Sequence, residues 1–213
     1  MSILSVNPLQ SGYVSYGDQD ENYNDNDWLR CGVQSSTSIQ YQALVQFGIS
    51  AIPAGSTVNS ATLKLYSYSN SCYSAETTIL AKRITSSWDY TDVQYDNKPT
   101  TTSTNQASTT DEDYGTWFEW DVVDIVQAWV NGTSNYGFYM IQDGLTTARG
   151  KCFKRTSTYV PVLEIDYDPL NMWVSDGSAW QKAKELHVHD GTQWRQADAG
   201  GAVHNGAGWQ TFM

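Results

Sequence analysis

Hydrophobic residues along most of this chain alternate with polar ones or occur in short runs, which is the pattern of β-strands. Ala43–Phe47 is a short apolar run, whereas Ala61–Tyr68 alternates and places Leu63 and Leu65 on one face. Residues 53–55 (PAG) separate the two stretches and are typical of a turn. Short strands at this frequency predict an all-β, antiparallel sandwich of jelly-roll type.

Other strands are predicted at Gly12–Tyr16, Thr77–Arg83, Tyr136–Ile141 and Val160–Tyr167. Between them, Trp88 is expected to anchor the segment 86–99 to the sandwich, because a large aromatic side chain in a polar loop needs a surface to cover it. The Ser/Thr-rich stretch that follows Pro99, up to Thr110, is predicted to be an exposed loop.

A single stretch, residues 120–131, has helical spacing. Its apolar residues at positions i, i+3, i+4 and i+7 are Val122, Ile125, Val126 and Trp129. Asp121 is expected to accept backbone N–H groups at the start of this helix, and Asn131-Gly132 to end it in a left-handed turn. One short amphipathic helix cannot bury its own apolar stripe, so it should close one end of the sandwich or lie across it.

The pattern changes after residue 168. Gly177, Gly191 and Gly206 are separated by 14 and then 15 residues, and each follows an Asp or Asn between short apolar segments. Asp-Gly and Asn-Gly favour type I′ turns, so this internal repeat predicts three β-hairpins. We therefore expect a sandwich over residues 1–168 and a hairpin appendage over residues 169–213, which needs another surface to bury its Trp side chains.

Composition narrows the classes of function. The chain has 12 Lys and Arg against 23 Asp and Glu, a net charge of -11, so nucleic acid and anionic membranes are not expected partners. The N-terminal residues show neither the basic region and apolar core of a signal peptide nor a membrane-spanning length. Cys31, Cys72 and Cys152 form no C-x-x-C pair, and they predict reduced thiols and maturation in a reducing cytoplasm.

An acidic loop follows the first predicted strand. Its carboxylates, interleaved with Asn residues, are Asp18, Asp20, Glu21, Asp25 and Asp27. Carboxylate and amide oxygens are the ligands that calcium prefers, so the loop is a candidate calcium site, although it lacks the order of ligands found in an EF-hand. The alternative is a solvated acidic loop that binds no metal.

Aromatic residues are numerous, with 9 Trp and 14 Tyr against 5 Phe. Amphipathic aromatic rings suit sugar-stacking surfaces, protein interfaces and small β-cores alike. The candidates for contact with a glycan or a partner are Tyr13, Tyr16, Tyr23, Trp28, Trp180, Trp194 and Trp209. The alternative for each Trp is a structural role in the core or at an interface.

No catalytic constellation stands out in the sequence. His187, His189 and His204 fall in the repeats and would suit a zinc site, but equivalent polar positions on the solvent face of the hairpins explain them as well. Acidic residues are plentiful, yet nothing in their spacing sets two of them at a cleft as glycoside hydrolysis requires. We therefore expect a protein that is not an enzyme.

An ordered set of motifs resembles a known family. These motifs are Phe47, IPAG at 52–55, Val58, ATL at 61–63, SWD at 87–89, Asn97, Pro99, DV at 121–122, VQAWV at 126–130, NYGF at 135–138, Pro161 and LEI at 163–165. They resemble the DNRLRE (disaggregatase-related) domain over about residues 11–168. The resemblance implies a non-catalytic, carbohydrate-binding-module-like sandwich. The family usually has Asp before the first strand and Asn-Tyr-Gly soon after, where this chain has residues 11–13 (SGY) and 22–24 (NYN).

The C-terminal repeats resemble the W-x-x-DG-x-x-W tracts of tailed-bacteriophage structural proteins. Together, these features predict a non-enzymatic virion surface protein, either a capsid decoration protein or a tail-fibre component, assembled in the host cytoplasm. Its expected partners are other virion proteins, further copies of itself in a homo-oligomer, and polysaccharide. The alternative is a glycan-binding module of a polysaccharide-degrading or cell-surface system.

Overall fold

A computed structural model describes residues 2–34, 39–68, 76–111, 114–144 and 150–169, together with six short strands between residues 173 and 211. One sheet system holds eleven strands. They are β1 (Ser2–Val6), β2 (Pro8–Ser15), β3 (Trp28–Gln34), β4 (Ile39–Phe47), β5 (Thr57–Tyr68), β6 (Thr77–Ile84), β7 (Thr101–Asp111), β8 (Trp117–Asp121), β9 (Phe138–Gln142), β10 (Gly150–Lys154) and β11 (Val162–Asp168). The helix α1 spans Val123–Val130.

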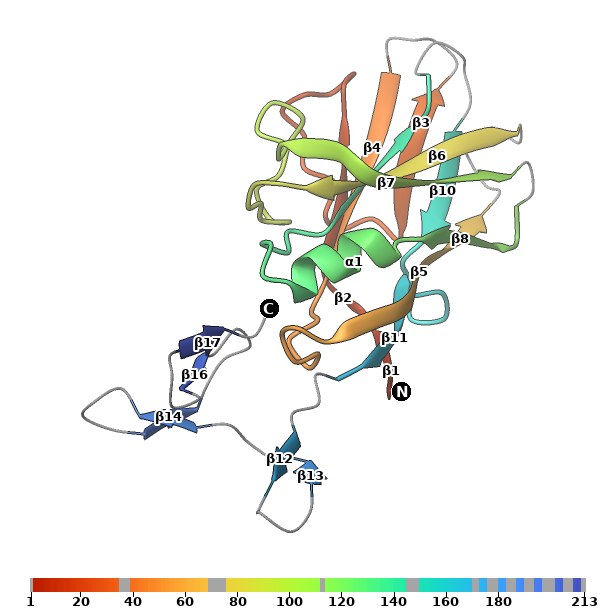
Figure 1. The fold of residues 1–213 in the computed structure, drawn as a ribbon. Helices are drawn as coiled ribbons and strands as arrows, with labels where there is room; N and C mark the ends of the chain where they lie inside the picture. Colours follow the sequence, from red (N-terminus) through yellow and green to blue (C-terminus); the bar gives the residue numbers. More distant parts are fainter. Residues whose placement is uncertain are drawn as a thin grey trace.

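These strands form two layers that share β5 (Figure 1). In one layer, β5 lies between β11 and β8, and β1 extends the layer beyond β11. The last residues of β5, Ser67 and Tyr68, pair instead with β10, which continues through β3 to β4. Strand β4 also pairs with β9, which pairs with β6, and β6 pairs with β7. The other edge of β4 pairs with β2. All these pairs are antiparallel, which confirms the predicted all-β sandwich class.

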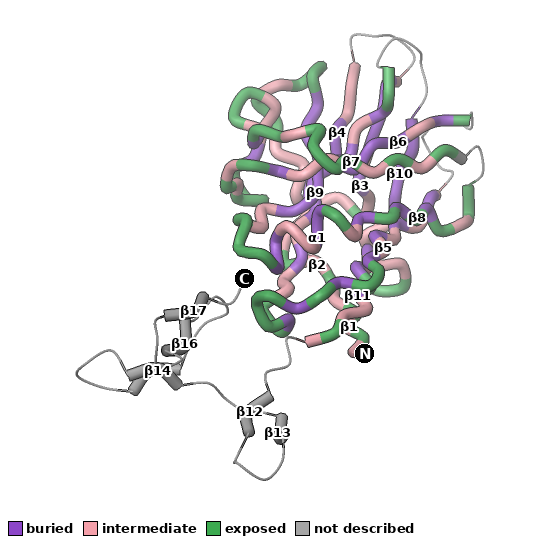
Figure 2. Tube along the Cα trace, viewed as in Figure 1, coloured by how far each residue is buried: buried purple, intermediate pink, exposed green. Residues whose placement is uncertain are grey.

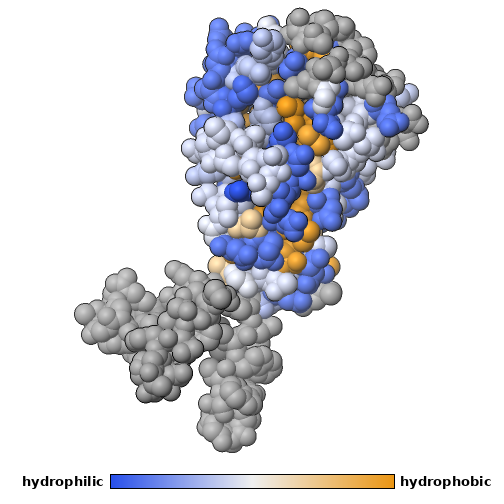
Figure 3. Space-filling model, turned by 45° about the horizontal axis from the view of Figure 1, so that its top comes forward, coloured by the Kyte–Doolittle hydropathy of each residue, from blue (hydrophilic) through white to orange (hydrophobic). Residues whose placement is uncertain are grey.

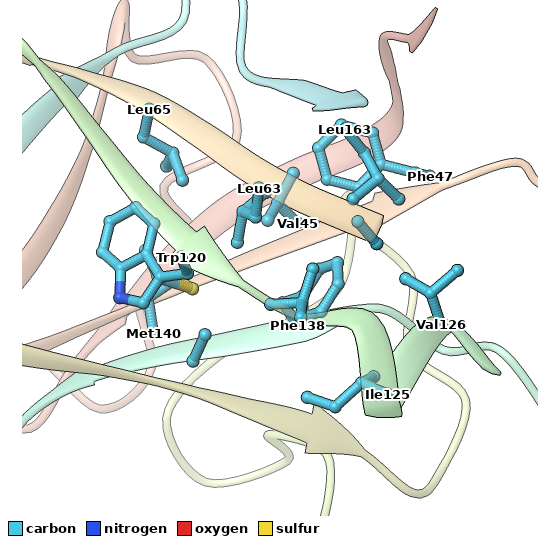
Figure 4. Packing of buried hydrophobic residues seen from close by; sticks show 14 of the residues in the cluster. Val45, Phe47, Leu63, Leu65, Trp120, Ile125, Val126, Phe138, Met140 and Leu163 are labelled. Carbon is cyan, nitrogen blue, oxygen red and sulfur yellow. The ribbon is translucent and has the colours of Figure 1, made fainter. Parts of the chain in front are cut away.

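The core lies between the layers and is filled from alternate strand positions. Leu63 and Leu65 of β5 and Phe118 and Trp120 of β8 are buried there, as the period of two in a strand requires (Figures 2 and 4). The Trp120 indole Nε1 donates a hydrogen bond to the Ile79 carbonyl oxygen at 2.8 Å. Its polar atom is thus satisfied while its ring is fully buried.

Helix α1 packs on β5 and β7 (Figure 1). Its Ile125, Val126 and Trp129 side chains are buried in the core, so the predicted apolar stripe is confirmed. Val122 occupies the N-cap position without a capping side chain, and the Asp121 carboxylate accepts the Val123 N–H at 3.2 Å. Beyond Asn131 the chain turns through Gly132, whose φ is 98°, as the sequence predicted.

A second, smaller apolar cluster confirms the expected role of Trp88. The Trp88 ring packs against this cluster, which consists of Val14, Leu44, Ile84, Val93 and Tyr139. The Trp88 Nε1 donates to the Tyr136 carbonyl oxygen at 2.8 Å. The segment between β6 and β7 is therefore fastened to the sheet from outside the main core.

The prediction of an exposed loop up to Thr110 is wrong, because residues 101–111 form strand β7 along β6. Thr is β-branched and favours strands, while polar side chains suit the solvent-exposed edge of a sheet. Asn105 has a positive φ of 61°, and the register with β6 shifts between Ala81 and Arg83. This irregularity interrupts the edge and makes it a poor template for pairing with another chain.

The prediction of reduced thiols is wrong for Cys152, which is disulfide-bonded. Its partner lies outside the described residues. Cys31 is free and buried, and burial raises the pKa of its thiol. An odd number of cysteines therefore does not indicate that all of them are reduced, because one buried thiol can leave an even number to pair.

Beyond residue 172 the structure describes three two-stranded antiparallel hairpins, as predicted. They are β12 (Trp173–Ser175) with β13 (Trp180–Lys182), β14 (His187–His189) with β15 (Trp194–Gln196), and β16 (Ala202–His204) with β17 (Trp209–Thr211). The predicted turn glycines lie outside the described residues. Within the part of the chain that is described, no helix is long and apolar enough to span a membrane.

Two glycines allow a matched test of how β9 is fitted against β4. Gly137 and Gly132 have similar φ values of 94° and 98°, so alanine at either is strained by a comparable amount. A Cβ at Gly137 would also overlap the Val45 carbonyl oxygen and lie 2.8 Å from the Gln46 Cα, whereas one at Gly132 meets nothing within 4 Å.

We expect Gly137→Ala to lower the free energy of unfolding by about 1–3 kcal/mol more than Gly132→Ala, which is the range for overpacking. Urea denaturation followed by Trp fluorescence measures both variants. If both variants lose the same free energy of unfolding, the backbone around Gly137 accommodates the added Cβ without cost, which would contradict the prediction.

Candidate functional site

The acidic loop is fastened to the segment between β6 and β7 through amide groups. The Asn22 side-chain nitrogen donates to the carbonyl oxygens of Tyr90 and Val93, at 3.0 and 2.7 Å. The Gln94 side-chain nitrogen donates to the Asp20 carbonyl oxygen at 2.6 Å. Backbone and amide groups therefore hold this loop in place.

The carboxylates of the loop have separate surroundings. Asp18 accepts the Tyr23 hydroxyl at 3.0 Å. Burial lowers the pKa of Arg155, and it outweighs the negative charges of Asp25 and Asp27, which raise that pKa. Among the described residues, no three His, Cys, Asp or Glu side chains form a group that could hold a metal ion. The calcium site formed by Asp18, Asp20, Glu21, Asp25 and Asp27 stays a prediction from sequence alone.

Two of the predicted aromatic residues, Tyr13 and Trp28, lie beside one cation, and a third, Tyr23, stacks on Tyr13. We call this group, made of Tyr13, Tyr23, Trp28, Arg30 and Tyr41, the Arg30 cluster. The rings of Tyr13 and Tyr23 stack with centroids 4.5 Å apart and an interplanar angle of 12°. The Arg30 guanidinium carbon lies 5.2 Å from the Tyr41 ring centroid and 6.0 Å from those of Tyr13 and Trp28. These are cation–π distances, so the cluster is an internally bonded unit.

Burial limits what the Arg30 cluster presents to solvent. The sequence predicted that Tyr13 contacts a glycan or a partner at the surface. In the structure Tyr13 is 2% exposed and belongs to the main core, so its ring is not available there. Trp28 is half-buried, and its indole N–H lies near the Tyr13 hydroxyl without reaching hydrogen-bonding geometry. Of the predicted residues Tyr13, Tyr16, Tyr23 and Trp28, only Tyr16 is exposed. Its ring lies edge-on to that of Tyr95, with the centroids 5.2 Å apart. The side chains of Trp180, Trp194 and Trp209 lie outside the description.

A second aromatic group lies on the outward face of β5 and β8, where the sequence predictions named no site. Tyr66 of β5 is paired with Trp117 of β8, and their ring centroids are 5.4 Å apart at 73°. Tyr159 stacks on Tyr66 at 3.9 Å and 15°. We call Tyr66, Trp117 and Tyr159 the aromatic platform. The sequence signal was the alternation itself, since Leu63 and Leu65 point inward and Tyr66, the next residue, must point outward.

The platform is partly exposed and held in place, with the Tyr66 and Tyr159 rings half-buried. Trp117 is 38% exposed, and Tyr114 nearby in the chain is 58% exposed. The Tyr66 hydroxyl donates to the Gly115 carbonyl oxygen at 2.9 Å. The Tyr159 phenol raises the pKa of Tyr66, mainly through a side-chain hydrogen bond. Rings that pack on each other and are tied to backbone lose little further freedom when a ligand covers them.

Ionic groups adjoin the platform along the same strands. Lys64, two residues before Tyr66, lies 3.2 Å from a Glu119 carboxylate oxygen and 3.0 Å from one of Glu164. The hydrogen bond that Lys64 donates to Glu164 raises the pKa of Lys64; burial opposes this effect, and the contacts with Glu119 add to it. Aromatic rings beside carboxylates offer stacking and hydrogen-bond acceptors at one surface.

The surface drawn in Figure 3 carries its hydrophobic residues in a narrow stripe between hydrophilic ones. Tyr and Trp lie near the middle of the hydropathy scale, so an aromatic platform would not appear as a hydrophobic area in such a view. Ring geometry and exposure, rather than hydropathy, are therefore what distinguish this surface.

The model of carbohydrate-binding module family 96 matches residues 2–167. The chain therefore belongs to this family, which confirms the carbohydrate-binding-module-like domain expected from its motifs. No curated protein matches the chain.

The contact of Tyr23 with Asp18 predicts a dependence of stability on alkaline pH. Burial, followed by the hydrogen bond to the Asp18 carboxylate, raises the pKa of Tyr23 above its ordinary value. Because the folded pKa exceeds the unfolded one, the resulting stabilisation is complete below about pH 10 and is lost as the pH rises through the folded value.

We expect the free energy of unfolding of Tyr23→Phe to fall less steeply above about pH 10 than that of the wild type. Urea denaturation at several pH values measures the slopes. Tyr114→Phe, which changes an exposed ring, should keep the wild-type slope. A Tyr23→Phe slope equal to that of the wild type would show that the raised pKa of Tyr23 does not cause the loss of stability at alkaline pH.

Proposed function

We propose that this protein binds glycan without cleaving it, and that the aromatic platform is the contact surface. The observation that carries the proposal is the platform itself, in which Tyr66, Trp117 and Tyr159 pack on one another on the outward face of a sheet. Sugar C–H bonds carry partial positive charge and lie favourably over the negative face of an aromatic ring. Membership of a carbohydrate-binding module family supports the same function.

The platform suits binding because its geometry exists before the ligand arrives. Tyr66 and Trp117 stand on directly paired residues of two strands, whose register fixes the spacing of the rings. Binding sites on regular elements are held more firmly than sites on loops. Binding therefore orders little of the protein, and more of the stacking energy contributes to affinity.

Two carboxyl groups of the described residues are suited to accept hydrogen bonds rather than to donate a proton. A glycosidase needs one carboxylic acid with a raised pKa as its proton donor. Hydrogen bonds to the oxygens of Asp89 and Asp168 lower the pKa of these two carboxyl groups. Such groups are carboxylates over the working pH range and act as acceptors.

For the biological setting we propose the surface of a tailed-phage virion, with the hairpins mediating assembly with other virion proteins and further copies of the chain. The three hairpins with Trp at equivalent positions support this setting. The disulfide at Cys152 favours the alternative, a module of a polysaccharide-degrading or cell-surface system, because disulfides form in oxidising compartments.

The platform is tested by removing one ring at a time. A polysaccharide that binds the wild type is first selected by affinity electrophoresis against a panel of soluble polysaccharides, and its affinity is then measured by isothermal titration calorimetry. We expect Trp117→Ala and Tyr66→Ala each to weaken binding about tenfold or more, since about 1.4 kcal/mol of ring contact is lost.

Tyr90→Ala is the matched control, because Tyr90 is 42% exposed and belongs to the loop between β6 and β7 rather than to the platform. Its affinity should stay within about twofold of the wild type, which is less than 0.5 kcal/mol. Loss of binding in Tyr90→Ala with full binding in Trp117→Ala would place the glycan elsewhere. Absence of any binding polysaccharide would contradict the proposed function.

The virion setting is tested separately. Mass spectrometry of purified particles from the phage that encodes the chain should find the protein at a fixed ratio to the major capsid protein. A gene that lies outside any phage or prophage, or particles without the protein, would contradict the virion setting and leave the alternative.

A further inference from the structure

We infer that the outer edge of strand β1 pairs with the same edge of a second copy of this chain, so that one sheet runs through a two-fold symmetric dimer. Neither the aromatic platform nor the hairpins take part in this contact. It uses the backbone and the side chains of residues 2–6.

Strand β1 lies at one end of the sheet and has an unprotected edge (Figure 1). Within the described part of the chain, β1 pairs with β11 and with no other strand, and this pairing runs over five residues without a register shift. The strand contains no charged residue and no proline. An edge strand without charge, proline or bulge presents its free N–H and C=O groups as a template for another strand.

The strand at the opposite end of the sheet, β7, shows how this fold protects an edge. Its pairing with β6 shifts register between Ala81 and Arg83, and Asn105 in the shifted part has a positive φ of 61°. Such irregularities prevent a further strand from pairing. Because β7 carries this protection and β1 carries none, the edge of β1 is suited to a partner strand.

The side chains of β1 leave apolar surface at this edge. On the outward face Ile3 is 80% exposed. On the inward face Leu4 and Val6 pack against the main core and are only partly buried. A further strand beside β1 would extend both faces of the sheet and cover these side chains, which favours association.

A second copy of β1 fits this edge because an antiparallel pair of identical strands is self-complementary. With the two-fold axis at Leu4, this residue faces its own equivalent in the other copy. On the outward face, the large Ile3 of each copy faces the small Ser5 of the other. Directly opposed side chains of this kind stabilise a sheet.

Charge does not oppose this contact, although each chain carries a net charge of -11. The carboxylates nearest in register belong to Asp166 and Glu164 of β11, which pair with Ile3 and Ser5. In the dimer, two β1 strands separate the two β11 strands, so these acids lie about 14 Å apart, which is three strand spacings. At physiological salt, repulsion is largely screened beyond about 8 Å.

Sedimentation velocity tests the dimer with the full chain. Five paired residues form a small interface, so we expect weak association that becomes visible between about 10 μM and 1 mM protein. In the double variant Ile3→Lys, Ser5→Lys, like charges face each other across the axis, and the dissociation constant of the dimer should rise about tenfold or more.

The matched control is Ile3→Lys, Ser5→Glu, which changes the same two positions but puts opposite charges across the axis. This variant should dimerise at least as well as the wild type. Both positions are exposed, so thermal unfolding should show that both double variants fold.

Cysteine cross-linking tests the register. Directly opposed residues have Cα atoms about 5.5 Å apart or less, which a disulfide can span. A mixture of Ile3→Cys and Ser5→Cys chains should therefore form covalent dimers when copper–phenanthroline and oxygen oxidise the thiols. Ile3→Cys alone should form few, because diagonal neighbours lie about 7–8 Å apart. Non-reducing electrophoresis measures both, and the wild type gives the background from the native cysteines.

A chain that stays monomeric up to about 1 mM would overturn the inference, because an edge contact weaker than this forms no specific dimer. Association that is unchanged in Ile3→Lys, Ser5→Lys would also overturn it, since another surface, such as the hairpins, would then hold the copies together. Equal cross-linking in the mixture and in Ile3→Cys alone would contradict the two-fold register. None of these results bears on glycan binding, which Trp117→Ala tests separately.

Discussion

The alternation of side chains along two paired strands is the constraint on which both the core and the candidate site depend. In β5 and β8 every second side chain points inward, so burying Leu65 of β5 and Phe118 of β8 forces the residues next to them to face outward. Tyr66 and Trp117 therefore lie side by side on the outward face, with Tyr66 half-buried and Trp117 exposed. A register slip of one residue would expose the core and bury the platform.

Sequence patterns predict the parts of this fold whose signal is local. The alternation around Leu63 and the helical spacing around Val126 each lie within one element, and both are confirmed. Strand β7 was missed because its Thr and Ser residues have no apolar alternation, and its position depends on pairing with β6. An edge strand open to solvent needs no apolar face, so hydrophobicity alone does not identify it.

The candidate site shows the same difference between local and long-range information. Tyr66, Trp117 and Tyr159 come from three separate parts of the chain, and only the pairing of β5 with β8 and the packing of Tyr159 bring their rings together. Conversely, Tyr13 stands in a polar, aromatic stretch that suggested a surface, yet the pairing of β2 with β4 turns its ring into the core. Composition indicates which side chains can bind sugar, and tertiary pairing decides which of them solvent can reach.

The ion pairs beside the platform contribute little to the stability of the fold. Glu119 and Glu164 are about half exposed, and ion pairs in such positions contribute about 0–1 kcal/mol to folding. β-Pairing and the buried aromatic side chains already hold β8, β5 and β11 together, so the strands do not need Lys64 to bridge them. The consequence of the group is electrostatic: one ammonium is shared by two carboxylates, which leaves a net negative charge next to rings that carry none.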